Sequence, residues 1–149
     1  MYQFNLTESL IAPQQDTDIR DTTTGGLLRD IAAAGADRPA LVEIGMDGQP
    51  GRRWSYGALL ADAERLAKAL ASRFQPGERL CVWSPNTPEW VLMEYACGLA
   101  GLVLVTANPA YQAKELRYVL EQSRSVALFL VASYRGNPMA EIGAEAVDG

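Results

Sequence analysis

Three short apolar runs in the second half of the chain constrain its fold more than any other feature. They are LCVW at 80–83, LVLV at 102–105 and VALFLV at 126–131, and they are apolar at every position. Such runs are typical of strands that are covered on both faces, as in parallel sheets. Because one helix-length segment separates each run from the next, the sequence predicts an α/β fold built on a parallel β-α-β-α-β sheet with flanking helices.

The segments between these runs carry helix signals. The first, 88–100, opens on Thr87, Pro88 and Glu89. A capping hydroxyl, a proline at the first helical position and a negative charge at the positive end of the helix dipole all favour a helix start there. A second helix is predicted from about 112 to 122.

The first half of the chain predicts a helix, a hairpin and a second helix. Apolar residues at helical spacing begin at Leu27, and Gly35 is suited to end that helix. Residues 40–44 and 52–56 flank a turn-rich segment and predict an antiparallel β-hairpin. A continuous apolar stripe over 59–70 predicts the next helix.

Domain organisation follows from the position of these signals. Residues 1–23 are polar and predict an extended or partly disordered arm. Residues 24–149 carry all the predicted helices and strands and are expected to form one structural unit.

Composition excludes several function classes. The chain has 149 residues, a net charge of −5 and no dense basic cluster, which argues against a nucleic-acid or anionic-membrane surface. It contains no histidine, so a His-activated nucleophile and a Cys/His zinc site are both excluded within it.

The cysteines and the length of the apolar stretches indicate the cellular compartment. Cys81 and Cys97 lie inside apolar segments and predict buried free thiols in a reducing compartment. No stretch approaches the roughly 20 apolar residues that span a bilayer, and the start of the chain lacks a secretory signal pattern. A cytoplasmic location is therefore expected.

Polar residues at the ends of the first two predicted strands are the candidate site. Ser84 and Asn86 follow the first strand, and Thr106 and Asn108 follow the second. Ligands of open parallel sheets gather beyond the carboxyl ends of strands. The same residue types also serve as ordinary turn and capping residues, so both interpretations stay open.

No catalytic residue and no metal ligand set can be picked out from the residues alone. Glu89 and Glu94 lie on different faces of one predicted helix, and Glu115 and Glu121 are expected to form solvated helix surface. Neither a dinucleotide fingerprint nor a phosphate-binding loop follows any of the three strands.

The order of these segments resembles a known family. The motifs that carry the resemblance are Gly77-Glu78-Arg79-Leu80, Ser84-Pro85-Asn86-Thr87-Pro88-Glu89-Trp90, Gly101-Leu102-Val103 and Asn108-Pro109-Ala110-Tyr111. In this order they resemble the N-terminal region of the AMP-forming acyl-CoA synthetases, the fatty-acid–CoA ligases of the adenylate-forming superfamily. The resemblance extends over about 25–142.

The resemblance implies a two-step reaction, in which a carboxylic acid, with fatty acids as the expected class, becomes an acyl-adenylate and then an acyl-CoA thioester. It implies ATP, Mg²⁺ and CoA as cofactors of the complete enzyme. It also adds Tyr111 to the candidate substrate contacts, because some synthetases extend CoA contacts to this turn. Those enzymes often use a basic residue near the turn, whereas the neighbours here are Ala110 and Gln112.

The family's phosphate-binding loop, adenine segment, ribose segment and catalytic lysine have no counterpart in this chain. We therefore expect an N-terminal fragment of the adenylation domain that is inactive and cofactor-free by itself and prone to self-association. The alternative is a free-standing, non-enzymatic α/β binding or interaction module.

Overall fold

The computed structural model of the protein describes residues 7, 19–45 and 47–148. Most of the predicted arm at 1–23 lies outside the described residues, and its part at 19–23 forms neither helix nor strand. The described residues form, in chain order, α1 (Thr24–Ala34), β1 (Pro39–Ile44), β2 (Pro50–Ser55), α2 (Tyr56–Ala71), β3 (Arg79–Trp83), α3 (Pro88–Ala100), β4 (Val103–Ala107), α4 (Ala113–Ser123), β5 (Ser125–Leu130) and α5 (Met139–Asp148).

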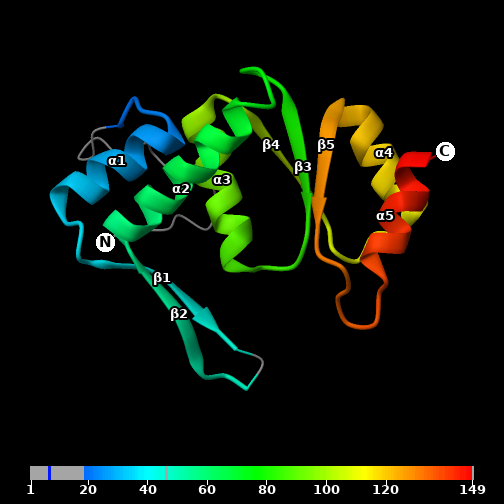
Figure 1. The fold of residues 1–149 in the computed structure, drawn as a ribbon, viewed down its shortest axis with the longest axis horizontal. Helices are drawn as coiled ribbons and strands as arrows, with labels where there is room; N and C mark the ends of the chain where they lie inside the picture. Colours follow the sequence, from blue (N-terminus) through cyan, green and yellow to red (C-terminus); the bar gives the residue numbers. More distant parts are fainter. Residues whose placement is uncertain (1–6, 8–18, 46, 149) are drawn as a thin grey trace.

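A three-stranded parallel sheet organises the larger part of the molecule. Its strand order is β4-β3-β5, so β3 is central and the other two strands each have one neighbour. Helices α1, α2 and α3 lie on one side of the sheet, and α4 and α5 lie on the other (Figure 1). The predicted α/β class with a parallel sheet and an N-terminal hairpin is confirmed.

Alternate side chains of β3 form two separate cores. Leu80 and Val82 pack with residues of α2 and α3, whereas Cys81 and Trp83 pack with residues of α4 and α5. All four are buried, as the continuous apolar run predicts for a strand covered on both faces. The runs of β4 and β5 are only partly covered: Val103 is 47% exposed and Val126 is 54% exposed, because both strands lie at an edge of this sheet.

Helix α3 has the predicted boundaries and the predicted signals at both ends. The hydroxyl oxygen of Thr87 accepts a hydrogen bond from the backbone N–H of Trp90 at 3.3 Å, and Pro88 occupies the first turn. Gly101 ends the helix in the left-handed conformation, at φ 72°. Because α3 packs against α1, α2 and the sheet, its nearly uniform apolar composition is explained.

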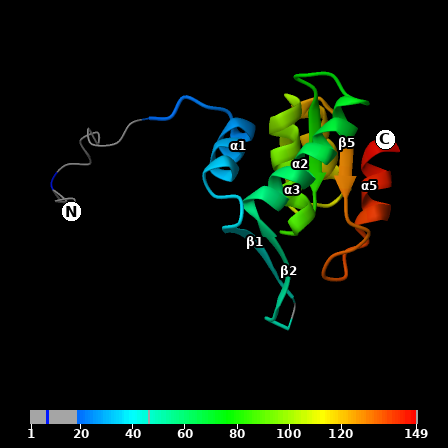
Figure 2. The same cartoon turned by 60° about the vertical axis from the view of Figure 1, so that its left-hand side comes forward.

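The hairpin β1–β2 pairs antiparallel, with Leu41 opposite Trp54. Figure 2 shows that it extends away from the helices and the three-stranded sheet. At its base, the Ser55 hydroxyl oxygen accepts a hydrogen bond from the backbone N–H of Ala58 and thereby caps α2. The indole N–H of Trp54 donates to the carboxylate of Asp62 on α2 at 2.9 Å, which ties the hairpin to this helix.

The structure differs from the sequence-based expectations at two helices. Helix α1 begins at Thr24 rather than at Leu27, because the Thr23 side chain caps it and Gly25 in the first turn packs against Leu99 of α3. Helix α5 was not predicted, although its buried residues Met139, Ile142 and Ala146 recur at helical spacing.

Glu115 is exposed, as expected, but it also has a structural role. Its carboxylate accepts a hydrogen bond from the backbone N–H of Gln112 at 2.9 Å and completes a capping box at the start of α4.

Candidate functional site

The topology of the sheet creates a natural place for a binding site between β3 and β5. Helix α3 leaves the carboxyl end of β3 toward one face, whereas α5, which follows β5 in the chain, packs on the opposite face. Neighbouring strands whose following helices lie on opposite faces define the switch point at which ligands of open α/β sheets bind. The carboxyl ends of β3 and β5 are therefore the first place to examine.

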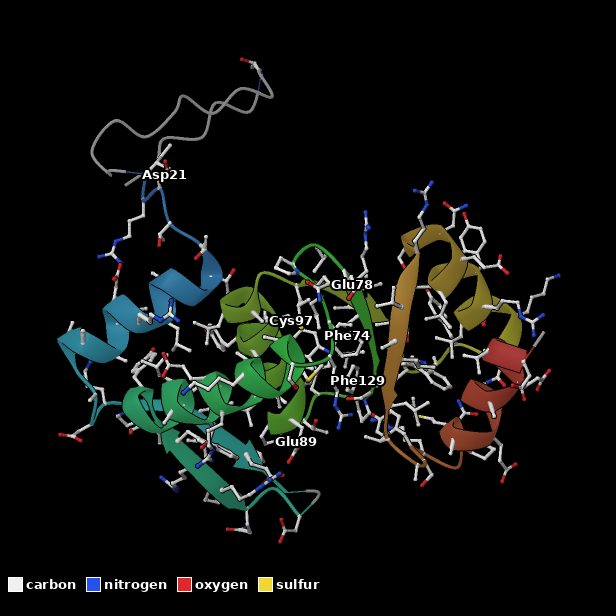
Figure 3. The ribbon with its side chains drawn as sticks, turned by 45° about the horizontal axis from the view of Figure 1, so that its top comes forward. Asp21, Phe74, Glu78, Glu89, Cys97 and Phe129 are labelled. Carbon is white, nitrogen blue, oxygen red and sulfur yellow. The ribbon has the colours of Figure 1, made fainter. Side chains whose placement is uncertain are left out.

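A crevice lies at this point, with a volume of about 450 Å³. It is lined by residues of α2, β3, α3 and β5, including Leu66, Val82, Met93, Phe129 and Val131. In Figure 3, Phe129 lies on the side of the sheet that faces α2 and α3. The walls are almost entirely apolar, which suits an apolar ligand group rather than a phosphate.

Three polar residues are among those that line the crevice. They are Ser84 after β3, and Thr87 and Glu89 at the start of α3. The Ser84 hydroxyl donates to the backbone oxygen of Pro85 at 2.7 Å, and the Thr87 oxygen caps α3, so both have roles within the local turn. These hydrogen bonds agree with the interpretation of Ser84 and Thr87 as ordinary turn and capping residues.

Glu89 belongs to a charged cluster that joins the hairpin to α3. The Arg52 guanidinium donates to both carboxylate oxygens of Glu43, at 2.8 and 3.0 Å, and to Glu89 at 2.6 Å. It also lies over the ring of Trp54, with its central carbon 5.4 Å from the ring centroid. Hereafter Arg52, Glu43 and Glu89 are called the Arg52 cluster. Figure 3 shows Glu89 at the end of α3 that is nearest the hairpin.

The electrostatics of the Arg52 cluster follow from its hydrogen bonds. Hydrogen bonding to Arg52 lowers the pKa of Glu43 and of Glu89 below the ordinary value, and the same bonds raise the pKa of Arg52. All three groups are therefore charged at neutral pH. One guanidinium with two carboxylates leaves the cluster with one net negative charge, and Glu89 is its member that lines the crevice.

The five sequence-predicted site residues are divided between two places. Ser84 lies at the crevice, and Asn86 is exposed in the adjoining turn. Thr106 and Asn108 are exposed at the end of β4, on the other side of β3, and Tyr111 is half-buried beside the α4–α5 core. The structure therefore brings the first two together and places the other three elsewhere; the binding role of all five stays a prediction.

The turn after β4 has its own internal hydrogen bonds. The side-chain oxygen of Asn108 accepts from the backbone N–H of Ala110 at 2.9 Å, which is an Asx turn. Its backbone oxygen accepts from the indole N–H of Trp83 at 2.8 Å. Asn108 thus fixes this turn against the central strand.

Sequence reasoning missed the Arg52 cluster and the part that β5 plays in the crevice. Arg52 and Glu89 are 37 residues apart, and no local pattern marks them as partners. Trp90 and Met93 pack in the core on the α2–α3 side and also line the crevice. A prediction of the strand order β4-β3-β5 would have pointed to the crevice, because this order defines the switch point.

The cysteines are not nucleophiles in this fold. Cys81 and Cys97 are free and buried, and burial raises the pKa of each thiol to about 11. At neutral pH they are therefore protonated and poorly reactive. They lie in the two different cores, Cys81 beside α4 and α5 and Cys97 beside α2.

The described residues do not fit a Mg²⁺ ion. Among residues 7, 19–45 and 47–148, no group of three or more His, Cys, Asp or Glu side chains could hold a metal. Glu89, which lines the crevice, is already hydrogen-bonded to Arg52. Within the same described ranges, no helix is long and apolar enough to cross a membrane.

Comparisons with known proteins place the chain in a family. A family model described as "AMP-binding enzyme" matches residues 28–148, which is most of the chain. Among curated proteins, the medium-chain acyl-CoA ligase ACSF2 of Mus musculus, named as mitochondrial, is 36% identical over 115 residues. That match covers 76% of this chain and 18% of the mouse protein, so the chain spans less than a quarter of the relative's length.

Solved structures agree in fold. A fatty acyl-CoA synthetase of Mycobacterium tuberculosis matches 82% of this chain and 23% of its own, with a TM-score of 0.72 and 26% identity. The N-terminal domain of FACL13 from the same organism matches 86% of this chain and 36% of its own, with a TM-score of 0.67 and 23% identity. From the family match, the strand order and the switch-point crevice, we conclude that this chain belongs to the AMP-binding enzyme family.

Proposed function

We propose that the chain forms the N-terminal portion of the adenylation domain of an ATP-dependent acyl-CoA ligase. In the first step the substrate carboxylate attacks the α-phosphorus of ATP, which forms an acyl-adenylate and releases pyrophosphate. In the second step the CoA sulfur attacks the acyl carbonyl, which forms the thioester and releases AMP. The observation that carries this proposal is the family match over residues 28–148, together with 36% identity to an acyl-CoA ligase.

The substrate class is a carboxylic acid, with fatty acids as the expected members, and the protein would act in fatty acid metabolism. The printed names of the relatives support this, since they describe a medium-chain acyl-CoA ligase and a fatty acyl-CoA synthetase. Ser84, Asn86, Thr106, Asn108 and Tyr111 remain the proposed substrate contacts.

The cofactors of the complete enzyme would be ATP, CoA and Mg²⁺. Because the described residues do not fit a metal ion, Mg²⁺ would be held by ATP and by parts of the enzyme other than these residues. We propose a cytoplasmic location, which the two free, reduced cysteines support. The mitochondrial name of the mouse relative is the competing location, and imaging of a fluorescent fusion would separate the two.

This chain alone is proposed to be inactive. Its thiols are buried and protonated, and Glu89, which lines the crevice, is hydrogen-bonded to Arg52. The test is ATP–pyrophosphate exchange with a panel of fatty acids. We expect no exchange from the 149-residue chain and measurable exchange from a polypeptide extended to the length of the relatives. Robust exchange by the 149-residue chain would contradict the proposal.

A free-standing binding module is the second candidate. It is favoured by the internal completeness of the packing: no buried side-chain polar atom among the described residues lacks a hydrogen-bond partner. Against it stand the half-exposed apolar edges of the sheet at Val103 and Val126, which favour self-association. Sedimentation combined with binding of a hydrophobic dye distinguishes the two, because a module should be monomeric and bind little dye.

A further inference from the structure

We propose that Trp83 is a positioning residue for the turn after β4, which carries two of the proposed substrate contacts, Asn108 and Tyr111. Its indole N–H holds this turn against the end of the central strand, and Gln112 ties the far side of the turn to the loop after β5. The link from the turn to a substrate rests on the proposed function. The positioning itself does not, because it concerns contacts within the described residues.

The indole of Trp83 is held in one orientation. Trp83 is the last residue of β3, is fully buried, and packs among residues of α4 and α5 that include Leu116 and Met139. Because protein cores are close-packed, a ring enclosed in this way cannot rotate without displacing its neighbours. Its N–H is therefore aimed at one acceptor, the backbone oxygen of Asn108 at 2.8 Å.

The acceptor lies in a turn that is closed by two further hydrogen bonds. The backbone oxygen of Asn108 also accepts from the backbone N–H of Tyr111 at 3.0 Å. The side-chain oxygen of Asn108 accepts from the backbone N–H of Ala110 at 2.9 Å. These two local bonds give the turn its shape, whereas the bond from Trp83 fixes the turn against the neighbouring strand.

Gln112 holds the other end of the turn. Its side-chain N–H donates to the side-chain oxygen of Asn137 at 3.3 Å, in the loop after β5. That loop is itself closed by two backbone hydrogen bonds between Tyr134 and Asn137, at 3.1 and 2.9 Å. The turn after β4 is thus attached to the central strand on one side and to the loop after β5 on the other.

A buried tryptophan can serve packing alone, and one substitution separates packing from positioning. Phenylalanine in place of Trp83 keeps an aromatic ring in the core but lacks the N–H group. The Asn108 oxygen keeps a partner, the N–H of Tyr111, so no acceptor is left unpaired. Trp83→Phe therefore removes the positioning hydrogen bond with a smaller loss of packing than Trp83→Ala.

The first experiment measures amide hydrogen exchange of the 149-residue chain by nuclear magnetic resonance. Trp83→Phe should speed exchange at Ala110 and Tyr111 about fivefold relative to the amides of β3, which report global unfolding. Trp54→Phe is the matched control, because it removes an indole hydrogen bond of similar length, 2.9 Å to Asp62, elsewhere in the fold. It should leave this ratio unchanged.

Two outcomes of this experiment overturn the positioning role. One is an equal acceleration at every protected amide, which would show that Trp83 contributes packing alone. The other is an equal response of the turn in Trp83→Phe and Trp54→Phe. If Trp83→Phe fails to fold, the unmodified chain decides: the indole N–H of Trp83 should exchange as slowly as the Tyr111 amide, and rapid exchange of this indole N–H refutes the proposal.

The part assigned to Gln112 has its own test. Gln112→Ala should speed amide exchange at Asn137 about threefold and leave the amides of β3 unchanged, since one hydrogen bond between exposed side chains is lost. Gln122→Ala, the same change at an exposed position near the end of α4, is the matched control. Equal exchange at Asn137 in the two variants refutes the link between the turn and the loop.

The second experiment connects the positioning to the reaction and uses the polypeptide extended to the length of the relatives. A residue that positions a binding contact raises KM and leaves kcat unchanged. Trp83→Phe should raise the KM of one substrate, the acid, ATP or CoA, about three- to fivefold, the factor for one lost hydrogen bond. Trp54→Phe should change none of the three. A fall in kcat with every KM unchanged overturns the positioning role in the reaction.

The two proposals can be rejected separately. Absence of turnover from the unmodified extended polypeptide rejects the ligase proposal, whereas the amide measurements still decide whether Trp83 positions the turn. A loosened turn with no change in any KM rejects the role of the turn in substrate binding and leaves the ligase proposal intact.

Discussion

The two faces of the parallel sheet are closed to different degrees. On the α4–α5 face, Trp83 and Met139 are fully buried, and Leu128 and Leu130 of the edge strand β5 pack into the same core. Leu128, Leu130 and the β5 side chain Phe129 on the α2–α3 face are all partly buried, but Phe129 packs against that core without a helix lying over β5 and lines the crevice. The same strand is thus covered on one face by the helix that follows it and left partly open on the other.

This difference is confined to the edge strand. The central strand β3 is buried on both faces, so the core is continuous up to the crevice. The crevice lies where the next strand, β5, has no covering helix on the α2–α3 face. We therefore expect the edge strand β5 to contribute more stability through the face that α5 covers than through the face that lines the crevice.

The largest expected effect compares one aromatic residue on each face. Trp83→Ala removes a fully buried side chain and should lower the free energy of unfolding by about 3–5 kcal/mol. Phe129→Ala removes a side chain that is already partly solvated and should cost about 1–2 kcal/mol. Urea unfolding measures both values. Equal costs would show that the two faces are packed equally well and would break the comparison.

The second prediction concerns the attachment of α5, which closes its face of the sheet. Arg117 on α4 donates to the backbone oxygens of Glu145 and Ala146, at 2.7 and 3.2 Å, at the carboxyl end of α5. Arg117→Ala should destabilise that end by about 1 kcal/mol and speed amide hydrogen exchange there. Lys114→Ala, an exposed position on the same helix, is the control. Unchanged exchange in α5 would mean that packing alone holds it.

The smallest effect is expected from the Arg52 cluster at the open face. The pKa of Glu43 and Glu89 is lowered in the folded state by hydrogen bonding to Arg52. Their contribution to stability is therefore present above the ordinary value of 4.5 and is lost as the pH falls through the lowered folded value. The effect is small because Glu89 and Arg52 are more than half exposed and Glu43 is about one-third exposed, so water screens the pairs.

Urea unfolding at about pH 7 and about pH 3 measures this contribution. The loss of stability on acidification should be smaller in Arg52→Ala than in the unmodified chain, and Arg53→Ala should behave like the unmodified chain. An identical acid response in both variants would show that the hydrogen bonds to Arg52 do not contribute to stability in solution.

The sequence by itself determined the elements and their class. The Thr87-Pro88-Glu89 start, the Gly101 stop and the three apolar runs are local signals, because caps, φ preferences and strand composition depend on neighbours in the chain. They predicted α3 with its observed boundaries and the parallel sheet. The apolar spacing of α5 was equally local, and that helix could have been predicted from it.

Only the tertiary structure decided where those elements form the candidate site. The order β4-β3-β5 separates Ser84 from Asn108 and Tyr111, although all three follow strands or turns of the same kind in the sequence. It also decides that the carboxyl ends of β3 and β5 form the crevice, and that Arg52 reaches Glu89 across 37 residues. Strand order and long-range ion pairs depend on how helices and strands that are distant in sequence pack against one another. A local sequence pattern carries no information about that packing.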